Sequence, residues 1–203
     1  EACSGFGRTF FFDGPGSRDS RSNDPLRQME KKMKESLVVI GNGMAGIAVV
    51  EDLLGRDAGR WAVTVFGAEP RPNYNRILLS DVLAGASRPE EIVLNSPAWY
   101  EANGIVLHMG DLVVKIDRDE KRVVSASGRS IVYDKLLVAT GSVPFIPPIP
   151  GADREGVFAY RTLDDVERIK ERAANSARAI VIGGGLLGLE AARALAKIGL
   201  EVK

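Results

Sequence analysis

The sequence has very few of the residue types that most often ligate metals or carry redox chemistry. Its 203 residues include one cysteine, Cys3, and one histidine, His108. A lone cysteine cannot form a disulfide framework, a cysteine-rich zinc site or a CxxC redox pair. The histidine lies in the apolar, strand-like segment IVLHM, which favours a structural role. We therefore expect neither a metal site nor a Ser-His-Asp triad within this chain.

The sequence also has no excess of either charge sign and no long apolar run. The chain has 27 basic and 27 acidic residues, so its net charge is zero. This balance argues against a protein that binds nucleic acid or anionic membranes non-specifically through its charge. No apolar run approaches the roughly 20 residues of a membrane span, and no secretory pattern opens the chain. We expect a cytoplasmic globular protein.

The first 35 residues differ from the rest in composition. They are rich in Gly, Ser, Arg and Asp and have no sustained periodicity, which is typical of a disordered extension. The chain does not begin with methionine, and Met33 stands four residues before the first expected strand. We therefore expect residues 1–32 to be an upstream or non-native extension.

A strand, a glycine-rich turn and a helix follow. Leu37 to Ile40 is a short apolar run that predicts a buried parallel strand. The next six residues have G-x-G-x-x-G spacing: Gly41, Asn42, Gly43, Met44, Ala45 and Gly46. The first glycine allows a tight turn, the second lets a pyrophosphate approach the backbone, and the third lets the helix pack close to the sheet. The free N–H groups at the helix start then bind phosphate oxygens.

An acidic residue at a suitable distance makes this motif more specific. Trp61 to Phe66 predicts a second strand, and Glu69 lies 69 − 46 = 23 residues after Gly46. A carboxylate about 20 residues beyond the glycines binds a ribose hydroxyl in dinucleotide-binding folds. The sequence therefore predicts a dinucleotide site. The alternative is that these glycines serve only helix–strand packing.

The middle of the chain predicts a small antiparallel insertion. Its expected strands, joined by tight turns, are 112–117, 122–127 and 130–134. Short helices are expected at Ile77 to Leu83 and after Ser96-Pro97, and a strand at Ile105 to Leu107. Lys135 to Ala139 then predicts a return to a buried strand, which ends in Thr140-Gly141-Ser142.

A proline-rich connector precedes a second copy of the opening motif. Residues 143–151, VPFIPPIPG, are stiff in composition and mark a domain boundary. A helix at 163–174 and a strand at 179–182 are expected next. The second G-x-G-x-x-G begins at Gly183, which is 183 − 41 = 142 residues after the first. This separation is long enough for two nucleotide domains.

The predicted fold class is therefore α/β. Residues 36–150 form a Rossmann-like domain with a small antiparallel β insertion, and 151–203 form the first half of a second Rossmann-like domain. The sequence stops at a strand that begins at Leu200. We expect a truncated product whose second nucleotide domain is incomplete.

Two dinucleotide fingerprints, the insertion and an ATG strand end, in this order, resemble the flavoproteins with two dinucleotide-binding domains in the pyridine nucleotide-disulfide oxidoreductase superfamily. The segments that carry the resemblance are ESLVVIGNGMAG, VTVFGAEPRPNYNRILLSD, YDKLLVATGSVPFIPPIPG, YRTLDDVERI and VIGGGLLGLEAA. Within that superfamily they look most like the N-terminal FAD- and NAD(P)-binding part of NAD(P)H-dependent nitrite reductase large subunits. The resemblance covers about Lys34 to Lys203.

The resemblance implies FAD in the first domain and NAD(P)H in the second. It implies FAD contacts from the whole first motif and from Glu69 at the adenosine ribose, Val113 beside the adenine, and Arg76, Ala139, Thr140 and Gly141. Arg161 is expected to contact a cofactor as well. The resemblance also implies NAD(P)H contacts from Gly183, Gly185, Leu186 and Gly188, with Glu190 near the nicotinamide. Each position also has a purely structural interpretation: a solvated charge, an ordinary strand end or, for Val113, a core valine.

Two differences from other members of the superfamily indicate which branch this chain resembles. Ferredoxin-reductase-like relatives carry a lysine where this chain has Asp81, and no cysteine pair follows the first helix as in disulfide reductases. The resemblance thus implies hydride transfer from NAD(P)H to FAD and electron transfer to a separate acceptor in nitrate assimilation. An iron–sulfur cluster and sirohaem are expected only in missing domains. The alternatives are an NADH-dependent rubredoxin or ferredoxin reductase and a non-catalytic nucleotide-binding fragment.

Overall fold

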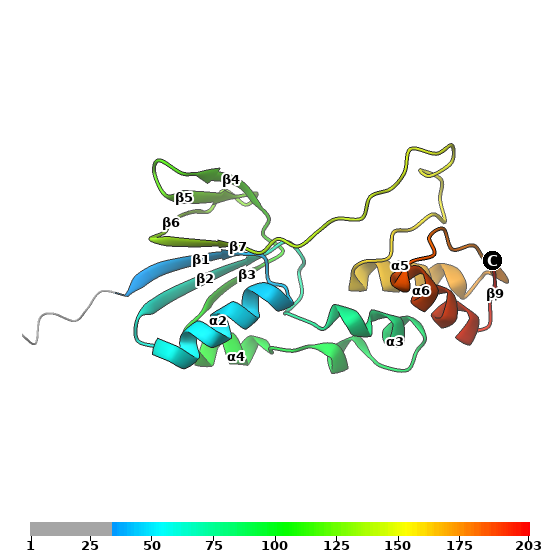
Figure 1. Ribbon diagram of the computed structural model, residues 1–203, viewed down its shortest axis with the longest axis horizontal. Helices are drawn as coiled ribbons and strands as arrows, with labels where there is room; N and C mark the ends of the chain where they lie inside the picture. Colours follow the sequence, from blue (N-terminus) through cyan, green and yellow to red (C-terminus); the bar gives the residue numbers. More distant parts are fainter. Residues whose placement is uncertain (1–33) are drawn as a thin grey trace, which may run out of the picture. The chain divides into compact units, whose positions relative to one another are not determined.

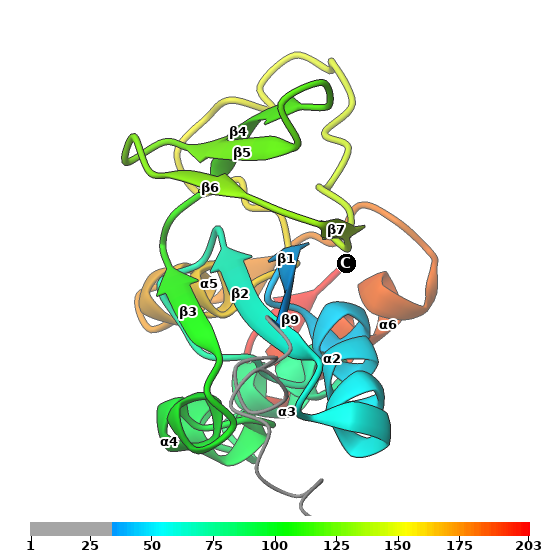
Figure 2. The same ribbon diagram turned by 90° about the vertical axis from the view of Figure 1, so that its left-hand side faces the viewer.

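The computed structural model describes residues 34–203, so the expectations for residues 1–33, Cys3 among them, lie outside the described residues. Its central element is a four-stranded parallel sheet (Figures 1 and 2). In order across the sheet, the strands are β3 (Val106–Met109), β2 (Trp61–Gly67), β1 (Glu35–Ile40) and β7 (Lys135–Val138). The predicted α/β class is confirmed.

Side chains of β1 are buried on both faces of this sheet, which explains its unbroken apolar sequence. Leu37 and Val39 pack with Ile47 and Val50 of the helix α2 (Met44–Asp57). Val38 and Ile40 point the other way and pack in a cluster with Val123 and Tyr133. Figure 1 shows α2 on one face and the small β4–β6 sheet on the other.

The predicted antiparallel insertion is confirmed as a three-stranded sheet in the order β4-β5-β6. Its strands are β4 (Val113–Asp117), β5 (Arg122–Ser125) and β6 (Ser130–Val132). Lys121 (φ 44°) and Gly128 (φ 85°) adopt left-handed conformations in the two connecting turns. Turns of this kind keep the strands in register over short distances.

The remaining helices follow α2 along the chain, and some of them begin at a side-chain cap. They are η2 (Arg76–Leu78), α3 (Leu79–Leu83), η3 (Pro89–Ile92), α4 (Pro97–Ala102), α5 (Leu163–Ala173) and α6 (Leu186–Lys197). The Ser96 side chain accepts a hydrogen bond from Trp99 N at the start of α4. Thr162 and Asp165 form a capping box at the start of α5. Within residues 34–203, none of the helices combines the length and apolar content that a membrane crossing requires.

A second core joins α3 to the later part of the chain. Val82 and Leu83 of α3 pack in one cluster with Leu163 and Val166 of α5 and Leu195 of α6. A short parallel pair, β8 (Arg178–Ala179) and β9 (Glu201–Val202), follows the same strand–helix–strand order as β1, α2 and β2.

Two expectations about strands were wrong in extent or burial. Lys135 to Ala139 was expected to be a buried strand, but β7 is an edge strand and Val138 is 56% exposed. The strand expected at 179–182 ends at Ala179, and Ile180 and Ile182 are 76% and 77% exposed. In both cases an apolar sequence indicated burial, whereas burial depends on a neighbouring element that the described residues do not place there.

Candidate dinucleotide-binding site

The first glycine turn, Gly41–Gly46, is closed by backbone on two sides. Gly41 has φ +114°, and a Cβ atom there would lie 2.1 Å from the carbonyl oxygen of Ala139. A Cβ atom on Gly46 would lie 2.7 Å from the Gly41 carbonyl oxygen and 3.2 Å from Ala139 Cβ. Only glycine fits these positions, because one needs a left-handed conformation and both contact neighbouring atoms too closely.

The middle of the same turn is open. A Cβ atom on Gly43 would meet nothing within 4 Å. Gly43 is the N-cap of α2, and no side chain caps the helix there. The first-turn N–H groups, which belong to Met44, Ala45 and Gly46, therefore face a space that an anion can enter. The geometry fits a pyrophosphate at Gly43.

Residues that follow three strands of the sheet meet at this turn. Gly41 follows β1 and contacts Ala139, which follows β7. The Asn42 amide lies 3.5 Å from the carbonyl oxygen of Arg71, beyond β2. Carboxyl ends of parallel strands are the edge where α/β sheets bind ligands. Thr140 and Gly141 continue this edge, and both are exposed.

Glu69 belongs to a hydrogen-bonded cluster just beyond β2. One of its carboxylate oxygens pairs with Arg76, and the other accepts a 2.6 Å hydrogen bond from the Tyr74 hydroxyl. Arg76 also donates to the Tyr74 oxygen at 2.8 Å. Burial, followed by the hydrogen bond to Glu69, raises the pKa of Tyr74 well above its usual range. The phenol therefore keeps its proton and acts as a donor to the carboxylate.

Arg76 and Arg161, both predicted cofactor contacts, meet in the structure. Arg76 Nη1 donates to the carbonyl oxygen of Arg161 at 3.1 Å. Arg161 Nε donates to the carbonyl oxygen of Ser142 at 3.3 Å, directly after Gly141. The structure therefore brings Arg76, Arg161 and the strand end Thr140–Gly141 to one place.

Val113 lies at the start of β4, where it packs beside the sheet core that contains Val38 and Phe66. The segment before it is fixed to the end of β2: Gly110 N donates to the Glu69 carbonyl oxygen at 3.0 Å, and Asp111 N donates to the Gly67 carbonyl oxygen at 2.9 Å. The segment that leads into Val113 therefore lies beside Glu69, the predicted ribose residue. The contacts of Val113 itself are those of a core valine.

Tyr74 and Tyr100 are site residues that our sequence analysis missed. The Tyr100 hydroxyl donates to Asn42 Oδ1 at 2.7 Å and so orients the second residue of the glycine turn. Burial raises the pKa of Tyr100 to about 12. No spacing rule predicts this contact, since the two residues are 58 positions apart. Tyr74 could have been suspected from its place in the loop between Glu69 and Arg76.

The second glycine turn, Gly183–Gly188, repeats the local geometry of the first. A Cβ atom on Gly188 would lie 2.0 Å from the Gly183 carbonyl oxygen. Gly185 is the N-cap of α6, again without a side-chain cap, and has open space around it. Leu186, at the first position of α6, is 83% exposed. This turn is therefore a second position where a pyrophosphate fits.

Glu190 lies on an exposed part of α6. Burial raises the pKa of Tyr160 above its usual range, and the charges of Glu190 and Asp81 raise it further. Asp81 lies on α3 and Glu190 on α6, and both helices contribute to the core cluster against which Tyr160 packs. The Tyr160 hydroxyl is buried and has no hydrogen-bond partner among the described residues.

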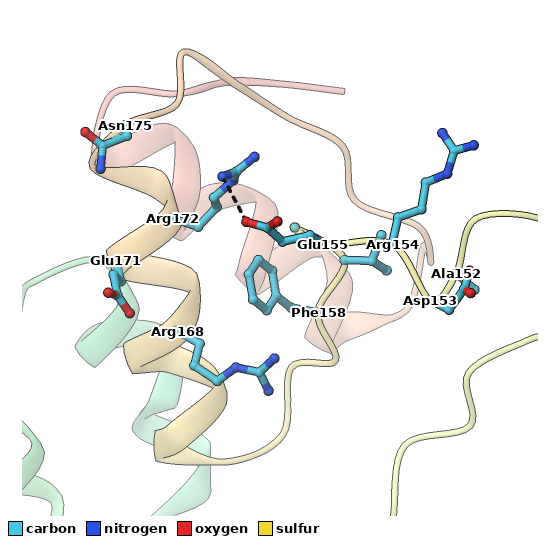
Figure 3. Close-up of a pocket in the computed structure, with 11 residues that line it drawn as sticks. Ala152, Asp153, Arg154, Glu155, Phe158, Arg168, Glu171, Arg172 and Asn175 are labelled. Atoms are coloured by element: carbon cyan, nitrogen blue, oxygen red, sulfur yellow. Dashed lines mark ion pairs between the residues drawn. The ribbon is translucent and has the colours of Figure 1, made fainter.

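A cavity of about 630 Å³ lies apart from both glycine turns, between residues 152–158 and α5 (Figure 3). The Arg168 guanidinium lies 5.4 Å from the centre of the Phe158 ring, and Arg172 pairs with Glu155 at 3.7 Å. Its charged lining residues are Asp153, Glu155, Glu171, Arg154, Arg168 and Arg172. Because acidic and basic residues are equal in number, this cavity does not define an anion site.

Two uncapped glycine turns, each between a parallel strand and a helix, define a protein that binds dinucleotides. Comparison with known proteins identifies the family to which the chain belongs. Residues 35–203 match the family model described as pyridine nucleotide-disulphide oxidoreductase. Because this match covers most of the chain, the chain belongs to the pyridine nucleotide-disulphide oxidoreductase family.

Named relatives are considerably longer than this chain. The chain is 49% identical over 169 residues to a nitrite reductase [NAD(P)H] of Bacillus subtilis (strain 168), covering 83% of this chain and 21% of that protein. It is 48% identical over 169 residues to the assimilatory nitrate reductase electron transfer subunit of the same organism, covering 83% and 22%. The chain thus spans about a fifth of each relative's length.

A solved structure with the same fold is the NADH:rubredoxin oxidoreductase of Clostridium acetobutylicum. The TM-score is 0.75 at 30% identity, covering 83% of this chain and 43% of that one. The likeness confirms the predicted architecture.

Proposed function

We propose that this chain is the nucleotide-binding part of an FAD-dependent NAD(P)H oxidoreductase. The observation that carries the proposal is the packing of the first glycine turn. Backbone atoms leave no room for a side chain at Gly41 or Gly46, whereas the space beside Gly43 is open. That combination supports a pyrophosphate at the start of α2. We assign residues 36–150 to the FAD-binding domain and 151–203 to the start of the NAD(P)H-binding domain.

FAD, when bound, supplies the acceptor for a hydride from NAD(P)H, and the protein binds and orients the two nucleotides. We assign Glu69 to the adenosine ribose and Val113 to the adenine side. Arg76, Arg161 and the strand end 139–141 surround the rest of the flavin site. In the second site, residues 183–188 hold the NAD(P)H pyrophosphate, and Glu190 lies on the nicotinamide side.

We propose that the electrons leave the flavin for a separate centre of the nitrite reductase type. Two relatives of nearly equal identity support this proposal, one named nitrite reductase [NAD(P)H] and the other assimilatory nitrate reductase electron transfer subunit. Nitrite reduction would require an iron–sulfur cluster and sirohaem from other domains, because clusters need several cysteine ligands. The likeness to a rubredoxin reductase favours a rubredoxin or ferredoxin as the second candidate acceptor.

The test is the visible spectrum of the purified chain after reconstitution with FAD and anaerobic titration with NADH and then NADPH. We expect a bound flavin whose absorbance bleaches. Bound flavin without bleaching would support the non-catalytic nucleotide-binding alternative. An absence of bound flavin would contradict the proposal for this chain. Reoxidation of the bleached flavin by rubredoxin, by ferredoxin or by a sirohaem-containing reductase module would then identify the acceptor.

A further inference from the structure

The Tyr74 hydroxyl makes every hydrogen bond that a phenol can make. It donates to Glu69 Oε2 at 2.6 Å and accepts from Arg76 Nη1 at 2.8 Å and from the Leu163 backbone N–H at 3.2 Å. A phenolic hydroxyl offers one donor and two acceptor positions. Tyr74 is 4% exposed, so water does not compete with these contacts. The hydroxyl therefore links three groups from different parts of the chain.

One of these groups is the start of α5. Leu163 is the first residue of this helix, and the N–H groups of a first helical turn lack partners within the helix. The Thr162 side chain accepts from Asp165 N, so it does not serve Leu163. Tyr74, which is 89 positions earlier, supplies that acceptor. The order of the first turn of α5 therefore depends on the loop beyond β2.

A second contact from the same loop supports this dependence. The Arg71 guanidinium pairs with Asp164 at 2.9 Å and with Glu167 at 2.7 Å, both on α5. Such partly exposed pairs add little stability singly, but together they fix which part of the loop faces α5.

The other end of the link is the Glu69 carboxylate. Arg76 pairs with one of its oxygens and Tyr74 donates to the other. The Glu69 side chain is still 24% exposed. A carboxylate oxygen can accept more than one hydrogen bond, so the exposed edge can also accept ribose hydroxyls. Because the carboxylate is already held in one orientation, binding would not have to order it.

We propose that Tyr74 is a positioning residue that holds Glu69 for the adenosine ribose of FAD and couples occupancy of that site to the first turn of α5. FMN lacks the adenosine half of FAD, so it makes no contact with Glu69. Tyr74 is therefore also a determinant of the preference for FAD over FMN. The role at the FAD ribose and the flavin preference rest on the proposed function, whereas the coupling from Glu69 to Leu163 does not.

The coupling is tested without nucleotide by hydrogen exchange at the Leu163 amide. We expect Tyr74→Phe to speed exchange, because the amide loses its acceptor. We also expect Glu69→Gln to speed it, because Tyr74 loses its charged partner. Tyr133→Phe is the matched control, since Tyr133 is a buried tyrosine of the sheet core outside this cluster. If Glu69→Gln leaves exchange at Leu163 at the wild-type rate, the coupling is wrong.

The role in binding is tested by titrating FAD and FMN into the wild-type chain and the two tyrosine variants. We expect Tyr74→Phe to weaken FAD binding by about tenfold, as for loss of one hydrogen bond to a charged group, and to leave FMN binding unchanged. FAD, but not FMN, should slow exchange at Leu163 in the wild type. An equal loss for both flavins would show that Tyr74 is merely structural. A wild-type chain that binds neither flavin would contradict the proposed function, while the nucleotide-free exchange result still decides the coupling.

Discussion

The two glycine turns share one sequence pattern but have different surroundings. In both turns, a Cβ atom on the third glycine would lie too close to the carbonyl oxygen of the first glycine. The distance would be 2.7 Å for Gly46 and 2.0 Å for Gly188. The first glycines differ: Gly41 is closed off by Ala139, whereas Gly183 has nothing within 4 Å of a Cβ position. The turn itself is thus a local property of the motif. Its enclosure comes from a strand about a hundred residues away.

The largest expected effect separates the first glycines. Gly41→Ala should destabilise the protein by more than about 4 kcal/mol, because the methyl group would overlap backbone and the left-handed conformation is strained as well. In Gly183→Ala the methyl group would overlap nothing, and only the backbone conformation (φ +130°) would be strained. This variant should lose about 1–3 kcal/mol of stability. Urea unfolding followed by circular dichroism measures both. Equal losses would mean that the two turns are equally enclosed.

The second glycines should affect binding rather than stability. Gly43 (φ −99°) and Gly185 (φ −76°) have ordinary backbone angles and open space, so alanine at either should change stability by less than about 0.5 kcal/mol. Gly43→Ala should weaken FAD binding by roughly tenfold or more, since the methyl occupies the pyrophosphate space. Gly185→Ala should weaken only NADH binding.

Gly55→Ala is the control for that pair, because Gly55 also has open space but lies far along α2 from the turn. It should leave both affinities at their wild-type values. Loss of FAD binding in the Gly185 variant would indicate that the two sites are not separate.

Two tyrosines with buried hydroxyl groups allow a further comparison. Tyr74 has a fully satisfied hydroxyl, whereas that of Tyr160, in the cluster beside α6, is unpaired among the described residues. Tyr160→Phe should therefore raise the free energy of unfolding by about 1 kcal/mol, because an unsatisfied buried group is removed. Tyr74→Phe should lower it. A Tyr160 variant that is less stable than the wild type would show that this hydroxyl has a partner in solution.

The smallest effect concerns His108 in β3, an edge strand of the sheet that carries the first turn. Burial, and next the charge of Arg129, lower the pKa of His108 below its usual 6.5. The folded protein thus binds this proton less readily than the unfolded chain. Stability should fall as the pH drops through 6.5 towards the lower folded value. Unfolding free energies between about pH 7.5 and 5.5 should show a steeper loss in the wild type than in His108→Gln.

Sequence reasoning succeeded where the signal is local. The strand before Gly41 and the helix expected at 163–174 depend on residues a few positions apart, so periodicity and spacing predict them. The meeting of Gly41 with Ala139 was also foreseeable, because parallel strands end at one sheet edge.

Features that depend on position in the tertiary structure were not predicted. The burial of β7 depends on which strands flank it, and an apolar sequence alone does not state that it is an edge. The hydrogen bonds of Tyr74 and Tyr100 join residues 89 and 58 positions apart. Propensity does not carry information about such partners, so the cluster around Glu69 became visible only in the structure.

The exposed isoleucines after β8 have a thermal consequence. Ile180 and Ile182, with Leu186, are exposed apolar side chains next to the second turn in sequence, and together they form this row of residues. Contacts between apolar surfaces weaken on cooling, because their driving force near room temperature is largely entropic. Self-association through this row should therefore be stronger in warm than in cold solution, opposite to the behaviour of a contact held by ion pairs of favourable enthalpy. A sample kept cold would then remain dispersed at concentrations at which a warm one does not.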